Sequence, residues 1–141
     1  MNSLFHNRIK IDLKTIIFQD AFIIFKMDIE ILRKICLAFP AVTEDVKWGN
    51  DLCFCIGEKM FCVTSLEPPH TFSFKVTDAE FDELSGSEGF KPAPYLARAK
   101  WVFVTDPSKL SRKDLKNYLQ QSYDLIKAKI PKKQRKDLGI E

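Results

Sequence analysis

The stretch that decides the fold is KWGNDLCFCIGEKMFCVTSL, residues 47–66. Two apolar runs, residues 52–56 and 59–65, flank the pair Gly57-Glu58. Two short runs of this composition around a two-residue loop that begins with Gly are typical of a β-hairpin. The stretch therefore predicts two antiparallel strands joined by a tight turn.

A regular two-residue loop also sets which residues face each other. Phe54 then lies opposite Phe61, and Cys53 lies opposite Cys62. Side chains alternate between faces along a strand. One face is therefore expected to carry Leu52, Phe54, Ile56, Phe61 and Val63, and the other face Cys53, Cys55, Met60 and Cys62.

Three thiols on one face make a soft-metal or redox site geometrically possible. Zinc sites prefer C-x₂₋₄-C spacing and a fourth ligand, whereas the spacing here is C-x-C and the chain holds two His. Both faces of the hairpin are also apolar, as in a strand that is covered on both sides. Core packing is the favoured interpretation, and we expect free thiols, no metal and no other cofactor.

Working outward, the pattern predicts further elements on both sides of the hairpin. A helix is predicted over residues 28–38, ending before Pro40, and strands are predicted over 70–75 and 101–105. Between these strands, a Thr77–Glu80 capping box predicts a short helix. A long helix is predicted from Ser111 to Pro131, with Asp114 completing its capping box. The run KKQRK, residues 132–136, is expected to be solvated.

The length of 141 residues and the 45% hydrophobic content indicate one globular domain. Four Cys without a secretory signal indicate a reducing compartment, and we expect a cytoplasmic protein. In residues 1–26, Gln19 and Asp20 interrupt the apolar runs, which are too short to span a membrane. We expect an N-terminal extension followed by a domain over residues 27–138. A membrane-surface or partner helix is the alternative for the extension.

The charge is distributed unevenly along the chain. Residues 28–90 carry five Lys/Arg and twelve Asp/Glu, a net charge of −7, whereas residues 91–141 carry thirteen and five, a net charge of +8. Such a distribution suits a polyanionic partner on one side. A solvated basic helix and tail is the alternative interpretation.

The segment FKPAPYLARAKWV, residues 90–102, interleaves basic and aromatic residues. Nucleic-acid surfaces use this combination, with cations for phosphates and rings for bases. The same pattern also describes a strand with buried aromatics and solvated charges. The candidate nucleic-acid-binding residues are Lys47, Lys59, Lys75, Lys91, Arg98 and Lys100, with Trp48 or Trp101 as stacking rings. Against this reading, Glu44, Asp45, Asp51 and Glu58 crowd the hairpin and repel phosphates.

Four motifs, KWGND at 47–51, GEKMF at 57–61, FKPAPYLARAKWV at 90–102 and QSYDLIKAKIPKK at 121–133, together resemble the MmcQ/YjbR family of small bacterial proteins. The resemblance covers residues 27–138, and FKPAPYL with the following Trp is its most specific part. It implies a single compact α+β domain of CyaY-like or double-wing type, with an antiparallel sheet flanked by helices. Frataxin-like relatives bind iron through an acidic first helix, which this chain lacks.

The resemblance also implies DNA as a partner, because the family is commonly labelled DNA-binding. The chain shows no nucleophile–base pair, Gly-rich phosphate loop or metal triad, so we expect a binding protein and not an enzyme. The alternative is a domain that binds a small ligand or a protein through a sheet face rimmed by Trp48, Tyr95 and Trp101. The sequence leaves the oligomeric state open.

Overall fold

The computed structural model describes residues 28–141, and the predicted N-terminal extension lies outside the described residues. The elements follow one another as α2 (Asp28–Leu37), β1 (Val42–Lys47), β2 (Asp51–Ile56), β3 (Lys59–Ser65), β4 (Phe72–Lys75), α3 (Asp78–Ser85), β5 (Phe90–Pro92), the 3₁₀ turn η1 (Ala97–Ala99), β6 (Trp101–Val104), the 3₁₀ turn η2 (Pro107–Lys109), α4 (Arg112–Lys127) and α5 (Lys132–Asp137).

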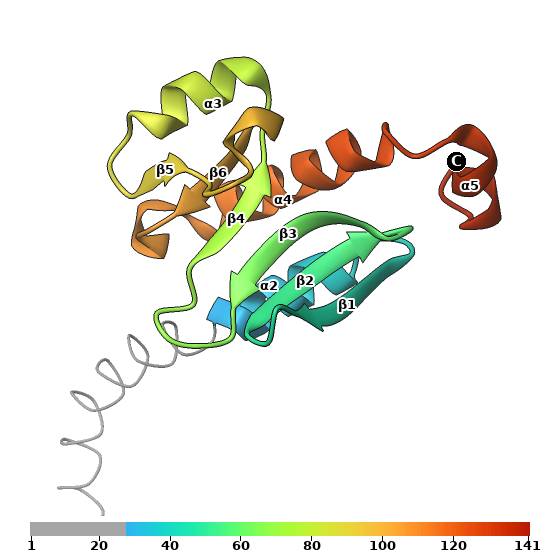
Figure 1. The fold of residues 1–141 in the computed structure, drawn as a ribbon, viewed down its shortest axis with the longest axis horizontal. Helices are drawn as coiled ribbons and strands as arrows, with labels where there is room; N and C mark the ends of the chain where they lie inside the picture. The colour runs from blue at the N-terminus through green and yellow to red at the C-terminus, as the bar shows by residue number, and fades with distance from the viewer. Residues whose placement is uncertain (1–27) are drawn as a thin grey trace, which may run out of the picture.

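The six strands form one antiparallel sheet in the order β1-β2-β3-β4-β6-β5. Helix α2 packs against β1 and α4, and α4 packs against β2, β3 and β4, whereas α3 contacts β5 and β6. Figure 1 shows α2 and α4 behind the twisted sheet and α5 beyond the β2–β3 turn. The predicted α+β class is therefore confirmed.

The core lies between the sheet and the two long helices. Leu52, Phe54 and Ile56 of β2 are buried with Leu32 of α2 and Leu119 of α4. The predicted capping box is complete at α3, where the Thr77 side chain accepts from the Glu80 N–H and the Glu80 side chain accepts from the Thr77 N–H. At α4 only half of the predicted box is formed in the described part: the Ser111 side chain accepts from the Asp114 N–H. Local sequence signals therefore set the ends of α3 and α4.

The predicted register of the hairpin is wrong beyond its turn. Cys55 pairs with Met60 as expected, but a β-bulge makes Phe54 pair with Cys62 and Cys53 with Val63. Phe61 is the extra residue of β3. Because of this one-residue shift, each β3 residue beyond the bulge lies on the opposite face of the sheet from the one that regular alternation predicts. Cys62 therefore belongs to the core between sheet and helices, where it lies beside Cys36.

The C-terminal basic run forms helix α5, in which Lys132, Lys133 and Lys136 are exposed as expected, whereas Gln134 and Arg135 are half-buried. The helix packs against the β2–β3 turn, where Gln134 Nε2 donates a hydrogen bond of 3.3 Å to the carbonyl of Gly57. Leu138 packs against the core, and Ile140 is buried. The contact links residues that are far apart in sequence, so local pattern did not reveal it.

Strand β1 was also absent from the sequence prediction. Its sequence VTEDVK is half charged, and its side chains are half-buried or exposed. It is an edge strand of the sheet, and edge strands carry charged side chains that discourage pairing with another chain. The charged residues of β1, which made the strand hard to predict from the sequence, are therefore explained by its position at the edge of the sheet.

Candidate nucleic-acid interface

The candidate residues of the first hairpin lie at opposite ends of β2. Lys47 and Trp48 precede β2, whereas Lys59 follows it. At about 3.3 Å per residue, the six residues of β2 separate the two ends by roughly 17–20 Å. The structure therefore does not bring these candidates together.

Acidic residues surround Lys47. It pairs with Asp51 across the β1–β2 ladder, and Asp45 lies two residues back along β1 and so on the same face. Lys47 also lies close to Cys53 and Cys55, whose pKa values it lowers slightly against the larger effect of burial. A phosphate at Lys47 meets repulsion from two carboxylates.

A second group of candidates does come together. Lys75 ends β4, and its Nζ donates a hydrogen bond to the carbonyl of Ala99, next to Lys100. Burial lowers the pKa of Lys75, and the charges of Lys129 and Lys100 lower it further, while Asp78 raises it. The charges of Lys100 and Lys129 therefore both act on Lys75, and we call these three residues the lysine cluster.

Lys129 was not among the predicted residues. It follows α4, and only the packing of α4 on the sheet brings it to Lys75. The signal that was available is weak, because a Lys at the end of a helix usually complements the helix dipole. Within residues 28–141, the ion pairs join Arg33 to Glu30 and Glu44 and join Lys109 to Glu88, so no member of the lysine cluster has one there.

Arg98 and Lys91 lie on the same half of the sheet as the lysine cluster. Arg98 is exposed on η1, two residues before Lys100. Lys91 is exposed on β5, with its Nζ 5.0 Å from the ring centre of Phe103. Both side chains are accessible to a large polyanion.

The two Trp residues differ in accessibility. Trp101 is 4% exposed, so its assignment as a stacking ring is wrong. It lies on β6 between β4 and β5, and backbone hydrogen bonds tie it to the segment before η1: the Ala93 N–H donates to the Trp101 carbonyl, and the Trp101 N–H donates to the Leu96 carbonyl. Trp48 is 73% exposed and keeps its candidate role.

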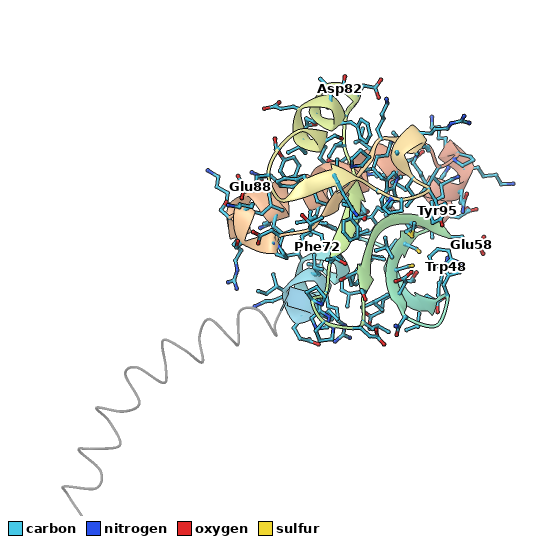
Figure 2. The ribbon with its side chains drawn as sticks, turned by 60° about the vertical axis from the view of Figure 1, so that its left-hand side comes forward. Trp48, Glu58, Phe72, Asp82, Glu88 and Tyr95 are labelled. Carbon is cyan, nitrogen blue, oxygen red and sulfur yellow. The ribbon has the colours of Figure 1, made fainter. Side chains whose placement is uncertain are left out.

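Tyr95 has the most exposed aromatic ring of the described residues, and Figure 2 shows it at the surface with Trp48. Both residues have a positive φ, +53° for Trp48 and +65° for Tyr95. A positive φ is unfavourable for a bulky side chain. Strain of this kind concentrates at functional sites, so both rings are candidates for contact with a ligand or partner.

The thiols do not form a joint site. All four Cys are free and buried, and Cys62 lies in the helix-side core while Cys53 and Cys55 lie outside that core. Burial, and then the neighbouring Cys55, raise the pKa of Cys53 to about 11. No group of three or more metal-ligating side chains is found in residues 28–141.

These features describe a small α+β domain with a basic end built from β4, η1 and the end of α4. No helix of the described part is long and apolar enough to cross a membrane. The YjbR family model matches residues 37–125, more than half of the chain, so the chain belongs to the YjbR family. The match includes Lys75 and Lys100 and ends before Lys129.

Two solved structures are similar to this chain. Protein DR2400 of Deinococcus radiodurans, with family-model domain DUF419, is 28% identical, with 78% of this chain and 86% of that chain covered and a TM-score of 0.70. A protein from Pseudomonas syringae shares the fold at 16% identity, with 60% of this chain and 86% of that chain covered and a TM-score of 0.50. No curated protein matches the chain.

Proposed function

We propose that this YjbR-family protein binds DNA through phosphate contacts at its basic end. The observation that carries the proposal is the lysine cluster, which gathers three cations beside the exposed Arg98. Cationic side chains on phosphates provide most of the affinity in sequence-tolerant binding. The proposal includes no catalytic step, because the buried Cys53, Cys55 and Cys62 have raised pKa values and are poor nucleophiles.

A salt-dependent titration tests the proposal. A short fluorescent duplex, and separately its single strand, is titrated with the protein at several salt concentrations while anisotropy is recorded. The log–log slope for the duplex should be roughly −0.9 per phosphate neutralised. Absence of binding to both probes at low salt would rule out the proposal.

Two matched charge reversals locate the contact. Arg98→Glu with Lys100→Glu changes the basic end, whereas Lys132→Glu with Lys133→Glu makes the same charge change on exposed residues of α5. The first pair should weaken binding and flatten the salt slope by about one unit per cation removed. Equal losses from both pairs would indicate attraction to net charge and would contradict the location.

A second candidate function is recognition of a protein or small ligand by the exposed rings. Trp48 and Tyr95 each combine a positive φ with a highly exposed ring, and backbone strain of this kind concentrates at functional sites, which favours this candidate. Trp48 lies beside carboxylates and away from the lysine cluster, so phosphate binding does not explain it. DNA affinity that is unchanged in Trp48→Ala and Tyr95→Ala would exclude the two rings from the DNA contact and leave them available for this second function.

A further inference from the structure

Exposed apolar side chains gather at one end of the sheet. Five large hydrophobic residues are exposed in the described part, and three of them, Val46, Trp48 and Leu66, lie at the end of β1 or in the adjacent loops. The Leu66 N–H donates a hydrogen bond of 2.9 Å to the carbonyl of Asn50, so the β3–β4 loop lies against the β1–β2 turn. The three exposed side chains therefore share one end of the sheet, which Figure 1 shows beside the start of α2.

The strand register places Val46 and Leu66 on the face of the sheet that the helices cover. Val46 pairs with Leu52, and Leu52 pairs with Thr64, and both partners are buried. Residues directly opposite each other project to the same face, and Leu66 follows Thr64 by two residues and so shares its face. At about 4.8 Å per strand, Val46 and Leu66 are roughly 10–12 Å apart. We call this pair the apolar end surface.

Helix α2 begins at the same end of the sheet. Glu44 of β1 accepts hydrogen bonds from Arg33 of α2, at 2.9 Å from Nε and 2.8 Å from Nη2. Because only a short connection joins the end of α2 to the start of β1, helix and strand run in opposite directions from this contact. Five helical residues at 1.5 Å each and two strand residues at about 3.3 Å each both span roughly 7 Å. Asp28, the first residue of α2, therefore lies at the level of Val46.

The chain that precedes Asp28 carries an apolar run within reach of this surface. The run is AFIIF, residues 21–25. At about 3.3–3.6 Å per residue, the three to seven residues from Asp28 back to this run reach at most roughly 10–25 Å. Residues 1–27 carry four Lys/Arg and two Asp, a net charge of +2, whereas residues 28–90 carry −7. The run therefore belongs to a segment that has both the reach and the charge to bind at this end.

We propose that residues 21–25 bind the apolar end surface, with Trp48 at its rim. Burial of apolar area drives the contact, and the opposite net charges of the two parts favour it. Because the run is tethered to α2, its effective concentration is on the order of millimolar, which favours even a weak contact. The bound run excludes a foreign protein from the same surface, so the segment acts as the protein's own competitor there.

Tryptophan fluorescence of the full chain tests the contact. The chain has two Trp, and Trp101 is buried whereas Trp48 is highly exposed, so quenching by acrylamide reports mainly on Trp48. A bound run should shield Trp48 from the quencher. The double change Ile24→Ser with Phe25→Ser, which we call the segment variant, should increase the quenching and shift the emission to longer wavelength. Unchanged quenching and emission would overturn the inference.

Two controls accompany the segment variant. Leu4→Ser with Phe5→Ser removes a similar apolar area from a part of the chain that is far from α2 in sequence, and it should leave the quenching unchanged. Trp48→Phe leaves Trp101 as the only fluorophore, so the response to the segment variant should vanish in this background. An equal increase in the Leu4 and Phe5 control would contradict a contact that is specific to residues 21–25.

A double-mutant cycle locates the contact on the sheet. Val46→Ser with Leu66→Ser changes two exposed side chains, and a thermal melt checks that the fold is retained. This surface variant should increase the quenching of Trp48 as the segment variant does, and the combination of both should add nothing further. Additive effects would place residues 21–25 elsewhere and contradict the inference.

Dilution distinguishes binding within one chain from binding between two copies. Within one chain, the quenching should not change with protein concentration. Quenching that increases on dilution, with a dimer in sedimentation at high concentration, would place the segment on a second copy and contradict binding within one chain. The inference is independent of the proposed DNA contact, because β4 begins beside the apolar end surface and ends at the lysine cluster. None of these readouts uses DNA, so failure of the DNA titration leaves the inference standing.

Discussion

The hydroxyl of Ser122 donates a hydrogen bond of 2.6 Å to the carbonyl oxygen of Phe61. Phe61 is the extra residue of the β3 bulge, and it lies one residue beyond Cys62, which forms the last β3–β4 pair with Phe74. The same hydroxyl accepts from the Lys75 N–H at 3.0 Å. One fully buried side chain on α4 therefore satisfies two backbone groups of the sheet.

Ser122→Ala should lower the free energy of unfolding by about 1–3 kcal/mol, because it leaves two buried backbone groups without a partner. Chemical denaturation measures the loss. Ser85→Ala is the matched control, since Ser85 Oγ is buried without a hydrogen-bond partner in the described part. A loss in Ser85→Ala as large as in Ser122→Ala would show that the two hydrogen bonds contribute nothing specific.

Gly57→Ala should destabilise the protein more than Gly49→Ala. Both glycines have a positive φ, +51° and +82° respectively, so each change costs about 1 kcal/mol in backbone strain. At Gly57 a Cβ also lies 2.9 Å from Gln134 Nε2, and displacing that group breaks its bond to the Gly57 carbonyl, which adds about 1 kcal/mol. At Gly49 nothing lies within 4 Å. Equal midpoints in denaturant would show that α5 does not depend on this contact.

Stability should fall in alkaline solution because of the buried thiols. An unfolded Cys titrates with a pKa of about 8.5, whereas burial raises the pKa of Cys53 to about 11. Between these pH values the unfolded chain loses a proton that the folded chain keeps, so the free energy of unfolding decreases. Cys53→Ala should show a shallower decrease over this range than the wild type. Identical pH profiles would contradict the pKa shift.

Trp48→Asn should leave stability unchanged or raise it by up to about 1 kcal/mol. Trp48 and Gly49 both have a positive φ in the three-residue turn between β1 and β2, and Asn adopts a positive φ at lower cost than Trp. The exposed ring contributes little packing that the substitution removes. A decrease in melting temperature would assign Trp48 a structural role and remove the argument that its strain serves binding.

The hairpin, the α2 helix and the caps of α3 and α4 were predictable because each depends on residues that are near neighbours in sequence. The bulge was not, since alternation alone gives a regular register, and the bulge carbonyl is satisfied by Ser122 of a distant helix. Helix α5 is short and charged, and it contacts Gly57, which is 77 residues away in sequence from Gln134. A local sequence pattern therefore could not reveal this contact. The likeness to a CyaY-like fold remains a prediction.

The candidate site was predictable only in part. Lys75, Arg98 and Lys100 lie on one half of the sheet, but Lys47 and Trp48 lie among carboxylates at the other end of β2. Trp101 is buried because it packs into the hydrophobic core, and the position of Lys129 depends on how α4 packs. Neither is visible in a local pattern of basic and aromatic residues.

The β3 bulge also determines where the chain tolerates a change of length. Deleting one residue at the bulge would restore the regular alternation between β2 and β3, with the turn at Gly57 and the strand ends unchanged. A deletion elsewhere in β3 would move core side chains to the opposite face of the sheet. Alignments of YjbR-family sequences should therefore place one-residue gaps in this hairpin next to Phe61, even where neighbouring letters match better in another register.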